Sequence, residues 1–383
     1  MQACTSNQKL ASIPTEKATD FQQTEWDRKF STLMSEHKIL TAGVAVIEGG
    51  KLVWSGNFGM QSPSVPASSK TQYNVGSVTK AVTAETVLRL VELGEISLDE
   101  SMSGHWIDPD LSGDSRHEQL TPRIALIHKT GFPNWRFFTP ERKLKFLTNP
   151  GEVFGYSGEG YEYLAKFAEK KTGEKFDALV QKHLFEPNKI TNAAFSIDTE
   201  NFGKIAQTKD SSGKFPGHYC YPENGYCRNP GSSTAADDLV ITIQDYAKFL
   251  IYVMTEKGYS SEIAKDRNTV QSDKGENATV DCQKVPTPNC PQAQGYGLGW
   301  EVIDYGDRKI ISHGGSDWHE LALTYFDTAS RDGVIIFLNA PNMVALEAMP
   351  KAIAILDPGS PMISLYQRWL DLTQAKSTET KAN

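Results

Sequence analysis

Short apolar runs separated by Gly- and Asp-containing turns lie at both ends of the chain and predict β-strands there. In the N-terminal part, residues 43–47 and 51–54 flank Gly49-Gly50, a pattern typical of a β-hairpin. The C-terminal part contains four further runs of this kind, at 300–303, 309–312, 321–326 and 334–338. The simplest architecture that uses both groups is one antiparallel sheet built from the two ends of the chain.

Between and beside these runs, apolar residues recur at helical spacing. The expected helices lie at 22–38, 79–93, 120–128, 158–172, 175–184, 242–255, 342–355 and 361–374. We therefore expect an α+β fold, in which helices flank the sheet and an all-helical subdomain is inserted between its strands. The expected divisions are a disordered tether at 1–21, a sheet region at 22–76 and 291–375, a mostly helical insertion at 77–290 and a frayed tail at 376–383. A ligand site belongs by default in the cleft between sheet and insertion.

The composition is that of an ordinary globular protein and argues against several classes of function. The 383 residues are 39% hydrophobic and 22% charged, with a formal net charge of −8. Because no run is rich in Lys or Arg, the chain offers no electrostatic footprint for nucleic acid. No stretch approaches about 18 uninterrupted apolar residues, so we expect no transmembrane helix. The eight His include no H-E-x-x-H motif, and we expect neither a metal nor another cofactor.

Four of the five cysteines form two close pairs in polar, turn-rich loops, Cys220 with Cys227 and Cys282 with Cys290. Two local disulfides, and hence an oxidising compartment, are the favoured interpretation. The alternative is five free thiols in the cytosol, whereas metal ligation is disfavoured because no C-x-x-C spacing occurs. The fifth, Cys4, follows a small residue and precedes a polar run, as in a bacterial lipoprotein after cleavage; the alternative is a chance Cys in a disordered tail. We expect a periplasmic or cell-envelope location, with any membrane attachment through a lipid on Cys4.

The first candidate for chemistry is Ser77-Val78-Thr79-Lys80, which opens a strongly apolar helix. Ser-x-x-Lys occurs three more times in the chain, but only in polar segments. On the predicted helix Lys80 lies one turn after Ser77 on the same face, while Glu85, Arg89 and Glu92 form a polar stripe beside it. A Ser hydroxyl becomes a nucleophile when a base takes its proton, and burial can lower the pKa of a Lys far enough for that role. The alternative is an ordinary helix cap at Ser77 and a solvated Lys80.

Two later elements supply possible partners. Tyr156 lies on a Gly-flanked loop before a predicted helix, which can hold a phenol rigidly at a cleft. The run His313-Gly314-Gly315-Ser316 ends a predicted strand, where two glycines let a substrate backbone approach. The Ser316 N–H would then be a second oxyanion donor beside the N–H of Ser77. The alternatives are a packed aromatic and a plain strand-end turn.

Together these segments resemble the serine β-lactamase and penicillin-binding protein group, in its class C β-lactamase-like branch, which also contains esterases and D-amino-acid peptidases. The resemblance covers about residues 40–355 and rests on the following segments: 73–80, 126–133, 150–161, 295–300 and 313–315. It implies an acyl-enzyme on Ser77, with Lys80 and Tyr156 sharing base and acid duty. It also implies that His313, Gly314, Gly315 and Ser316 bind the substrate backbone and complete the oxyanion hole. The substrate would be a small molecule or peptide.

The sequence departs from the family pattern in two motifs. Tyr156-Ser157-Gly158 stands where many members have Tyr-x-Asn, so the Asn that grips an acylamide is missing. His313 replaces a Lys, and its charge is expected to vary near pH 6.5. Asp317, Trp318 and His319 follow and are candidates to line the pocket. We expect a serine hydrolase of esterase or D-amino-acid peptidase type more than an efficient β-lactamase; the alternative is a non-catalytic penicillin- or cell-wall-binding sensor on the same scaffold.

Overall fold

The computed structural model describes residues 20–197, 200–209, 213–218, 220–221, 226–227, 231–275, 278–284, 290–317 and 319–382. Cys4 and the predicted tether up to residue 19 lie outside this set, as does Trp318. The predictions made for them therefore stay predictions.

Strands from both ends of the chain form one antiparallel sheet of eight strands, as predicted. Its order is β3-β2-β1-β13-β12-β11-β10-β9, so the N-terminal strand β1 pairs directly with the C-terminal strand β13. The strands are β1 Thr41–Glu48, β2 Lys51–Ser62, β3 Val65–Pro66, β9 Ala293–Tyr296, β10 Glu301–Asp304, β11 Lys309–Ser316, β12 Glu320–Asp327 and β13 Gly333–Asn339. Glu48 pairs with Lys51 across Gly49-Gly50, both glycines having positive φ, which confirms the predicted hairpin.

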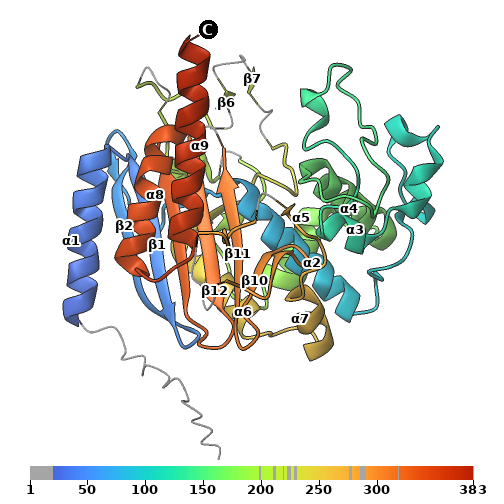
Figure 1. The fold of residues 1–383 in the computed structure, drawn as a ribbon, viewed down its shortest axis with the longest axis horizontal. Helices are drawn as coiled ribbons and strands as arrows, with labels where there is room; N and C mark the ends of the chain where they lie inside the picture. Colours follow the sequence, from blue (N-terminus) through green and yellow to red (C-terminus); the bar gives the residue numbers. More distant parts are fainter. Residues whose placement is uncertain are drawn as a thin grey trace, which may run out of the picture.

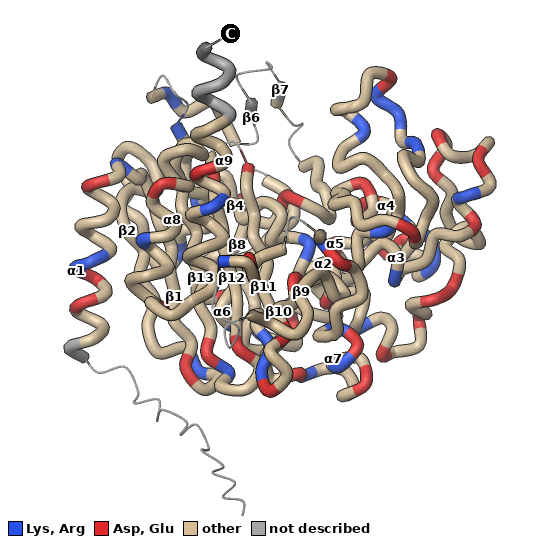
Figure 2. The backbone as a smooth tube through the Cα atoms, viewed as in Figure 1, with Lys and Arg blue, Asp and Glu red and all other residues tan. Residues whose placement is uncertain are grey.

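Helices cover both faces of this sheet and form the region beside it (Figure 1). They are α1 Asp20–His37, α2 Thr79–Glu92, α3 Pro122–Leu126, α4 Gly158–Thr172, α5 Phe176–Val180, α6 Ile243–Met254, α7 Ser261–Arg267, α8 Asn342–Leu356 and α9 Met362–Ala382. Short 3₁₀ turns are η1 Gly76–Val78, η2 Met102–Gly104, η3 Pro109–Leu111, η4 Ser115–Gln119, η5 Arg136–Phe138 and η7 Phe202–Lys204; a π-helical segment, η6 Gln181–Phe185, follows α5. Along the backbone, Lys and Arg are interspersed with Asp and Glu (Figure 2).

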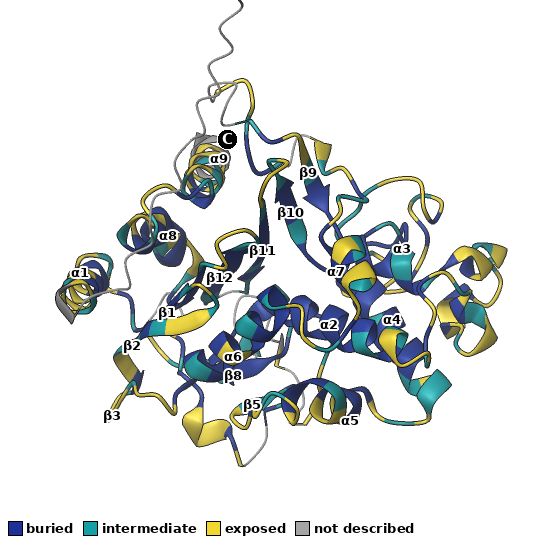
Figure 3. Cartoon of the chain, turned by 90° about the horizontal axis from the view of Figure 1, so that it is seen from below, coloured by how far each residue is buried: buried dark blue, intermediate teal, exposed yellow. Residues whose placement is uncertain are grey.

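The sheet separates two hydrophobic cores. Helices α1, α8 and α9 lie along one face, and α2 and α6 lie along the other (Figure 3). On β1, Val44 and Val46 lie in the core on the side of α1, α8 and α9, whereas Ala45 and Ile47 lie in the core on the side of α2 and α6. Successive side chains of a strand point to opposite faces, so strands buried on both sides read as continuous apolar runs.

The structure differs from the sequence prediction in several places. A small second sheet pairs β4 Gln72–Asn74, which precedes the predicted insertion, with β8 Val240–Thr242 and β5 Ala193–Ala194 inside it, and these strands are too short to show a period. Helix α9 continues to Ala382, over the tail expected to fray; the segment 376–382 holds no Gly or Pro to end it. Glu85, expected on a polar stripe of α2, is fully buried and binds Arg267 and Trp300.

Both predicted disulfides are present, which confirms the cysteine pairing. Cys220 and Cys227 join β6 Cys220–Tyr221 to β7 Tyr226–Cys227, and Cys282 is bonded to Cys290. Disulfides persist in oxidising compartments, so the two bonds are consistent with a protein outside the cytoplasm. Within the described ranges, no helix is long and apolar enough to cross a membrane.

Candidate active site

Ser77 lies on the tight turn η1, which runs directly into the buried helix α2. Gly76 adopts a φ of +51°, a left-handed conformation that favours glycine, and its N–H donates to the Asn74 side chain at 3.1 Å. The Thr79 hydroxyl donates to the Gly76 carbonyl at 2.6 Å. Ser77 is partly exposed, while the residues on either side of it are buried. The local sequence therefore holds one reachable hydroxyl at the start of an otherwise buried helix.

Lys80 is fully buried and points its amine at Ser77. Its Nζ donates to Ser77 Oγ at 3.0 Å and to the Ala236 carbonyl at 2.8 Å. Burial lowers the pKa of Lys80 to about 8, although the charges of Asp237 and Glu162 act in the opposite direction. A substantial fraction of this amine is therefore neutral slightly above neutral pH, and a neutral amine can accept a proton.

Tyr156 completes a group of three around the hydroxyl. Its ring centroid lies 4.9 Å from Lys80 Nζ, and its phenol lies near the Ser77 side chain. Burial raises the pKa of Tyr156 well above its usual range, so the phenol stays protonated. The ring of His128 packs against that of Tyr156 at 4.3 Å between centroids, and its Nδ1 accepts from the Ser157 N–H at 3.1 Å. His128 thus braces the loop that carries Tyr156.

Gly158, at the position of the missing Asn, lies directly against Trp135. A Cβ atom added to Gly158 would lie 2.5 Å from Cζ2 of Trp135, closer than real Cβ contacts allow. The same indole ring lies 5.9 Å from Lys80 Nζ. An aromatic wall therefore stands where the family pattern has an amide side chain. The sequence reasoning missed Trp135, and no spacing in the sequence identifies it.

The end of β11 packs against η1 and the nucleophile turn. A Cβ added to Gly315 would lie 2.1 Å from the Val75 carbonyl oxygen and 3.1 Å from the Ser77 nitrogen. A Cβ on Gly76 would lie 3.3 Å from the nitrogen of Ser316. Strand β10 pairs with β11 only as far as Ser312, so the last four residues of β11 run past its end beside Ser77. The close approach requires glycine at Gly315.

His313 is turned into the interior. Its side chain is buried on the face of β11 that carries Ile311, its Nε2 lies 3.0 Å from the Tyr296 hydroxyl and its Nδ1 2.7 Å from the Gly314 carbonyl oxygen. Burial, together with the charge of Lys80, lowers the pKa of His313 to about 4. The expectation that its charge varies near pH 6.5 is therefore corrected: the imidazole is neutral there.

The sequence reasoning also missed Asp237. This residue lies in the loop before β8, and its Oδ1 is 3.4 Å from Ser77 Oγ. It is 160 positions from Ser77 in a polar loop, so only the fold brings the two together. The one available signal is an Asp-Asp pair, Asp237-Asp238, placed immediately before an apolar run.

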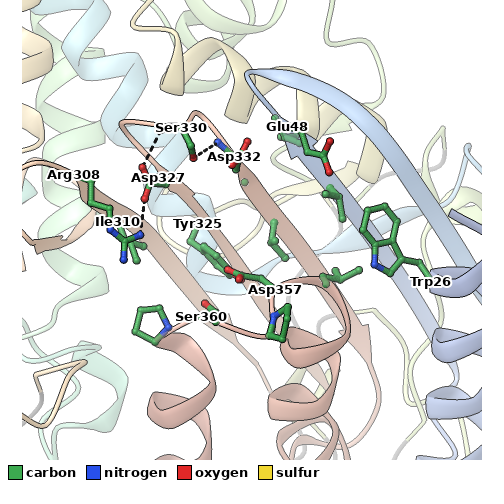
Figure 4. A pocket seen from close by; sticks show the side chains of 18 of the residues that line it. Trp26, Glu48, Arg308, Ile310, Tyr325, Asp327, Ser330, Asp332, Asp357 and Ser360 are labelled. Carbon is green, nitrogen blue, oxygen red and sulfur yellow. Dashed lines mark hydrogen bonds and ion pairs between the residues drawn. The ribbon is translucent and has the colours of Figure 1, made fainter. Parts of the chain in front are cut away.

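A separate cavity of about 400 Å³ opens on the other face of the sheet (Figure 4). Trp26 of α1, Ile310 of β11 and the loop 356–361 line it, and within it the Tyr325 hydroxyl donates to Asp357 at 3.0 Å. None of the three candidate catalytic side chains lines this cavity. Among the described residues, no group of three or more His, Cys, Asp or Glu is arranged to hold a metal ion.

Two known bacterial proteins are similar to this chain in sequence. Protein flp from Staphylococcus aureus (strain N315) is 21% identical over 360 residues, covering 89% of this chain and 67% of that protein. The putative penicillin-binding protein PbpX from Bacillus subtilis (strain 168) is 24% identical over 333 residues, covering 84% of this chain and 75% of that protein.

Solved structures agree on the architecture. The octameric penicillin-binding protein homologue from Pyrococcus abyssi superimposes with a TM-score of 0.67 at 23% identity, over 90% of this chain and 78% of that one. A class C beta-lactamase superimposes with a TM-score of 0.68 at 16% identity, over 91% of this chain and 99% of that one. The Beta-lactamase family model matches residues 26–356, most of the chain. The chain therefore belongs to the beta-lactamase family.

Proposed function

We propose that this protein is a serine hydrolase that forms an acyl-enzyme on Ser77 and acts on an ester or amide. The observation that carries the proposal is the 3.0 Å contact from the buried Lys80 Nζ to the reachable Ser77 Oγ, with Tyr156 beside both. Membership of the beta-lactamase family supports activity of the serine hydrolase type in general. We favour an esterase or D-amino-acid peptidase activity over efficient hydrolysis of β-lactams.

The lowered pKa of Lys80 and the raised pKa of Tyr156 support a division of labour. Neutral Lys80 takes the proton of Ser77 as Oγ bonds to the carbonyl carbon, and the electron pair of the C=O π bond moves to its oxygen. The N–H groups of Ser77 and Ser316 are the proposed donors to that oxyanion.

The tetrahedral intermediate then collapses. The electron pair re-forms the C=O bond, the bond to the leaving group breaks, and the leaving group takes the phenol proton of Tyr156. The proton held by Lys80 replaces it, which returns both side chains to their starting states. Water then attacks the acyl-Ser77 ester with the same groups in the same roles, releasing the acid.

Two contacts support an ester or peptide rather than a penicillin as substrate. The indole of Trp135 stands at Gly158, so no amide side chain grips an acylamide there. His313 is buried and neutral, so it supplies no positive charge to a substrate carboxylate. Both changes remove contacts to the substrate and leave the three proton-handling side chains in place.

The test combines covalent labelling with turnover. The parent and a Ser77→Ala variant are treated with an alkyl fluorophosphonate or a penicillin and analysed by intact mass spectrometry, then assayed on p-nitrophenyl esters, D-amino-acid p-nitroanilides and a chromogenic cephalosporin. An adduct on the parent alone, with turnover of at least one substrate, is expected. An adduct without any turnover would instead favour the non-catalytic sensor. Equal turnover by a folded Ser77→Ala protein would refute the assignment.

A further inference from the structure

The carboxylate of Asp237 beside the nucleophile leads to an inference that rests on the proposed function and concerns the charge of its substrate. We propose that Asp237 is a specificity-determining residue that selects substrates with a positive charge next to the scissile carbonyl. The α-ammonium group of an aminoacyl ester or amide has this charge in this place.

The geometry places the carboxylate within reach of such a group. Asp237 Oδ1 lies 3.4 Å from Ser77 Oγ and 3.6 Å from the point where a Cβ on Gly76 would lie. In an acyl-enzyme the carbonyl carbon is bonded to Oγ, and an α-nitrogen is only two bonds further along the chain. A carboxylate this close to Oγ can therefore accept a charge-assisted hydrogen bond from the ammonium group, a stronger contact than one between neutral groups.

Other carboxyl groups make the same region negative. Burial raises the pKa of Glu320 well above its usual range, and the charges of Asp317 and Asp237 raise it further. The charges of Asp317 and Asp237 both act on this carboxyl group, so the two carboxylates share one region and make it negative. Lys80 offsets this excess only while it is protonated, and it must lose its proton to act as the base. A cationic substrate would compensate the negative charge of the carboxylates when Lys80 is neutral.

An anionic substrate meets the opposite situation. The end of β11, where the family pattern has a Lys, carries His313 with its ring against Tyr296 and no positive charge. A substrate carboxylate next to the scissile bond would face Asp237 without a compensating cation from that strand. Specificity of this kind rests on repulsion of the wrong substrate as well as attraction of the right one.

The experiment compares two esters that share one leaving group, glycine p-nitrophenyl ester with a free ammonium group and its N-acetyl derivative. The ratio of their kcat/KM values is measured for the parent and for Asp237→Asn, after subtraction of the Ser77→Ala rate. Both esters use the same nucleophile, so any effect of Asp237 on the basicity of Lys80 cancels in the ratio. Asp332→Asn, in the β12–β13 turn at the opposite end of β12, is the matched control.

We expect Asp237→Asn to lower the preference for the ammonium ester by about tenfold or more, and Asp332→Asn to leave it unchanged. An unchanged ratio in Asp237→Asn, or an equal loss of both activities, overturns the proposal. Should Asp237→Asn fail to fold, added KCl must lower the preference of the parent, and a preference that salt does not change overturns the proposal. A parent that hydrolyses neither ester and forms no adduct on Ser77 refutes the hydrolase itself, which is a different result from hydrolysis without charge preference.

Discussion

The indole ring of Trp135 occupies the space beside Gly158. A Cβ at position 158 would lie 2.5 Å from the ring, so a larger side chain and the indole exclude one another. At the position where the family pattern has an amide side chain, this chain therefore has an aromatic wall from the segment before α4.

Gly158→Asn should therefore destabilise the protein by about 1–3 kcal/mol, the usual cost of forcing atoms into a packed site. Adding Trp135→Ala should recover part of that loss, because the indole is what the new side chain meets. Urea unfolding of the two single variants and the double variant measures the coupling between the positions. Strictly additive effects would show that the ring does not set the constraint.

Ser77→Ala should reduce turnover by about 10³-fold or more while changing the free energy of unfolding by less than about 0.5–1 kcal/mol. The side chain is partly exposed, so its removal leaves no buried cavity. The chain offers a matched control in Ser35→Ala, which removes an exposed serine from another Ser-x-x-Lys sequence on α1. Loss of activity in both variants would point to damage unrelated to the nucleophile.

The pH dependence of kcat/KM should follow Lys80. Because the base must be neutral, activity should rise with pH and level off above the Lys80 pKa of about 8. Lys80→Met removes the base and should abolish both the activity and this titration. A parent profile that is flat between pH 6 and 9 would contradict the role of Lys80 as the base.

The same pKa makes a prediction about stability. The pKa of Lys80 is lowered from 10.5 to about 8 in the folded state. Between these two pH values, Lys80 is therefore mostly protonated in the unfolded chain and mostly neutral in the folded one. The free energy of unfolding should therefore increase as pH rises from about 8 to 10.5. Below this window Lys80 is charged in both states, and the folded protein carries the full cost of burying that charge. Lys80→Met should lack this contribution and be more stable than the parent at pH 7. Equal urea midpoints for the two proteins at pH 7 would argue against a buried charged amine.

His313 should not titrate in the range where an ordinary histidine does. Burial and the charge of Lys80 hold its pKa at about 4, so its imidazole resonances should stay constant between pH 8 and 5.5. An NMR titration, with His313→Asn used to assign the signal, checks this. A titration near pH 6.5 would mean that the ring faces solvent.

The buried pair of Glu85 and Arg267 should be a strong determinant of stability. Both side chains are fully buried, 3.2 Å apart, and Glu85 also accepts from Trp300 Nε1 at 2.9 Å. Arg267→Met should cost about 3–5 kcal/mol, because it leaves a buried carboxylate without its cation. Thermal unfolding tests this, with Arg28→Met on the surface of α1 as the control. A loss below about 1 kcal/mol would show that this ion pair is not a strong determinant of stability.

The local spacing of apolar residues was enough to predict most of the helices and strands. The apolar runs of β1, β12 and β13 and the helical spacing of α2 and α4 predicted their structure because burial imposes a period on consecutive residues. The same logic failed for Glu85, since polarity alone does not distinguish a solvated stripe from a buried ion pair. It failed also for β4, β5 and β8, which are only two or three residues long.

The sequence by itself determined that Ser77 begins an apolar helix with Lys80 one turn later, because helical geometry places two such residues on one face. It also predicted one sheet from the strands at both ends of the chain and favoured the two cysteine pairs that the structure contains. Only the tertiary structure decided that Trp135 fills the space beside Gly158, that His313 turns inward and is neutral, and that Asp237 reaches Ser77. Those relations join residues from different elements, and no local period records which distant side chains share a site or how far burial shifts their pKa.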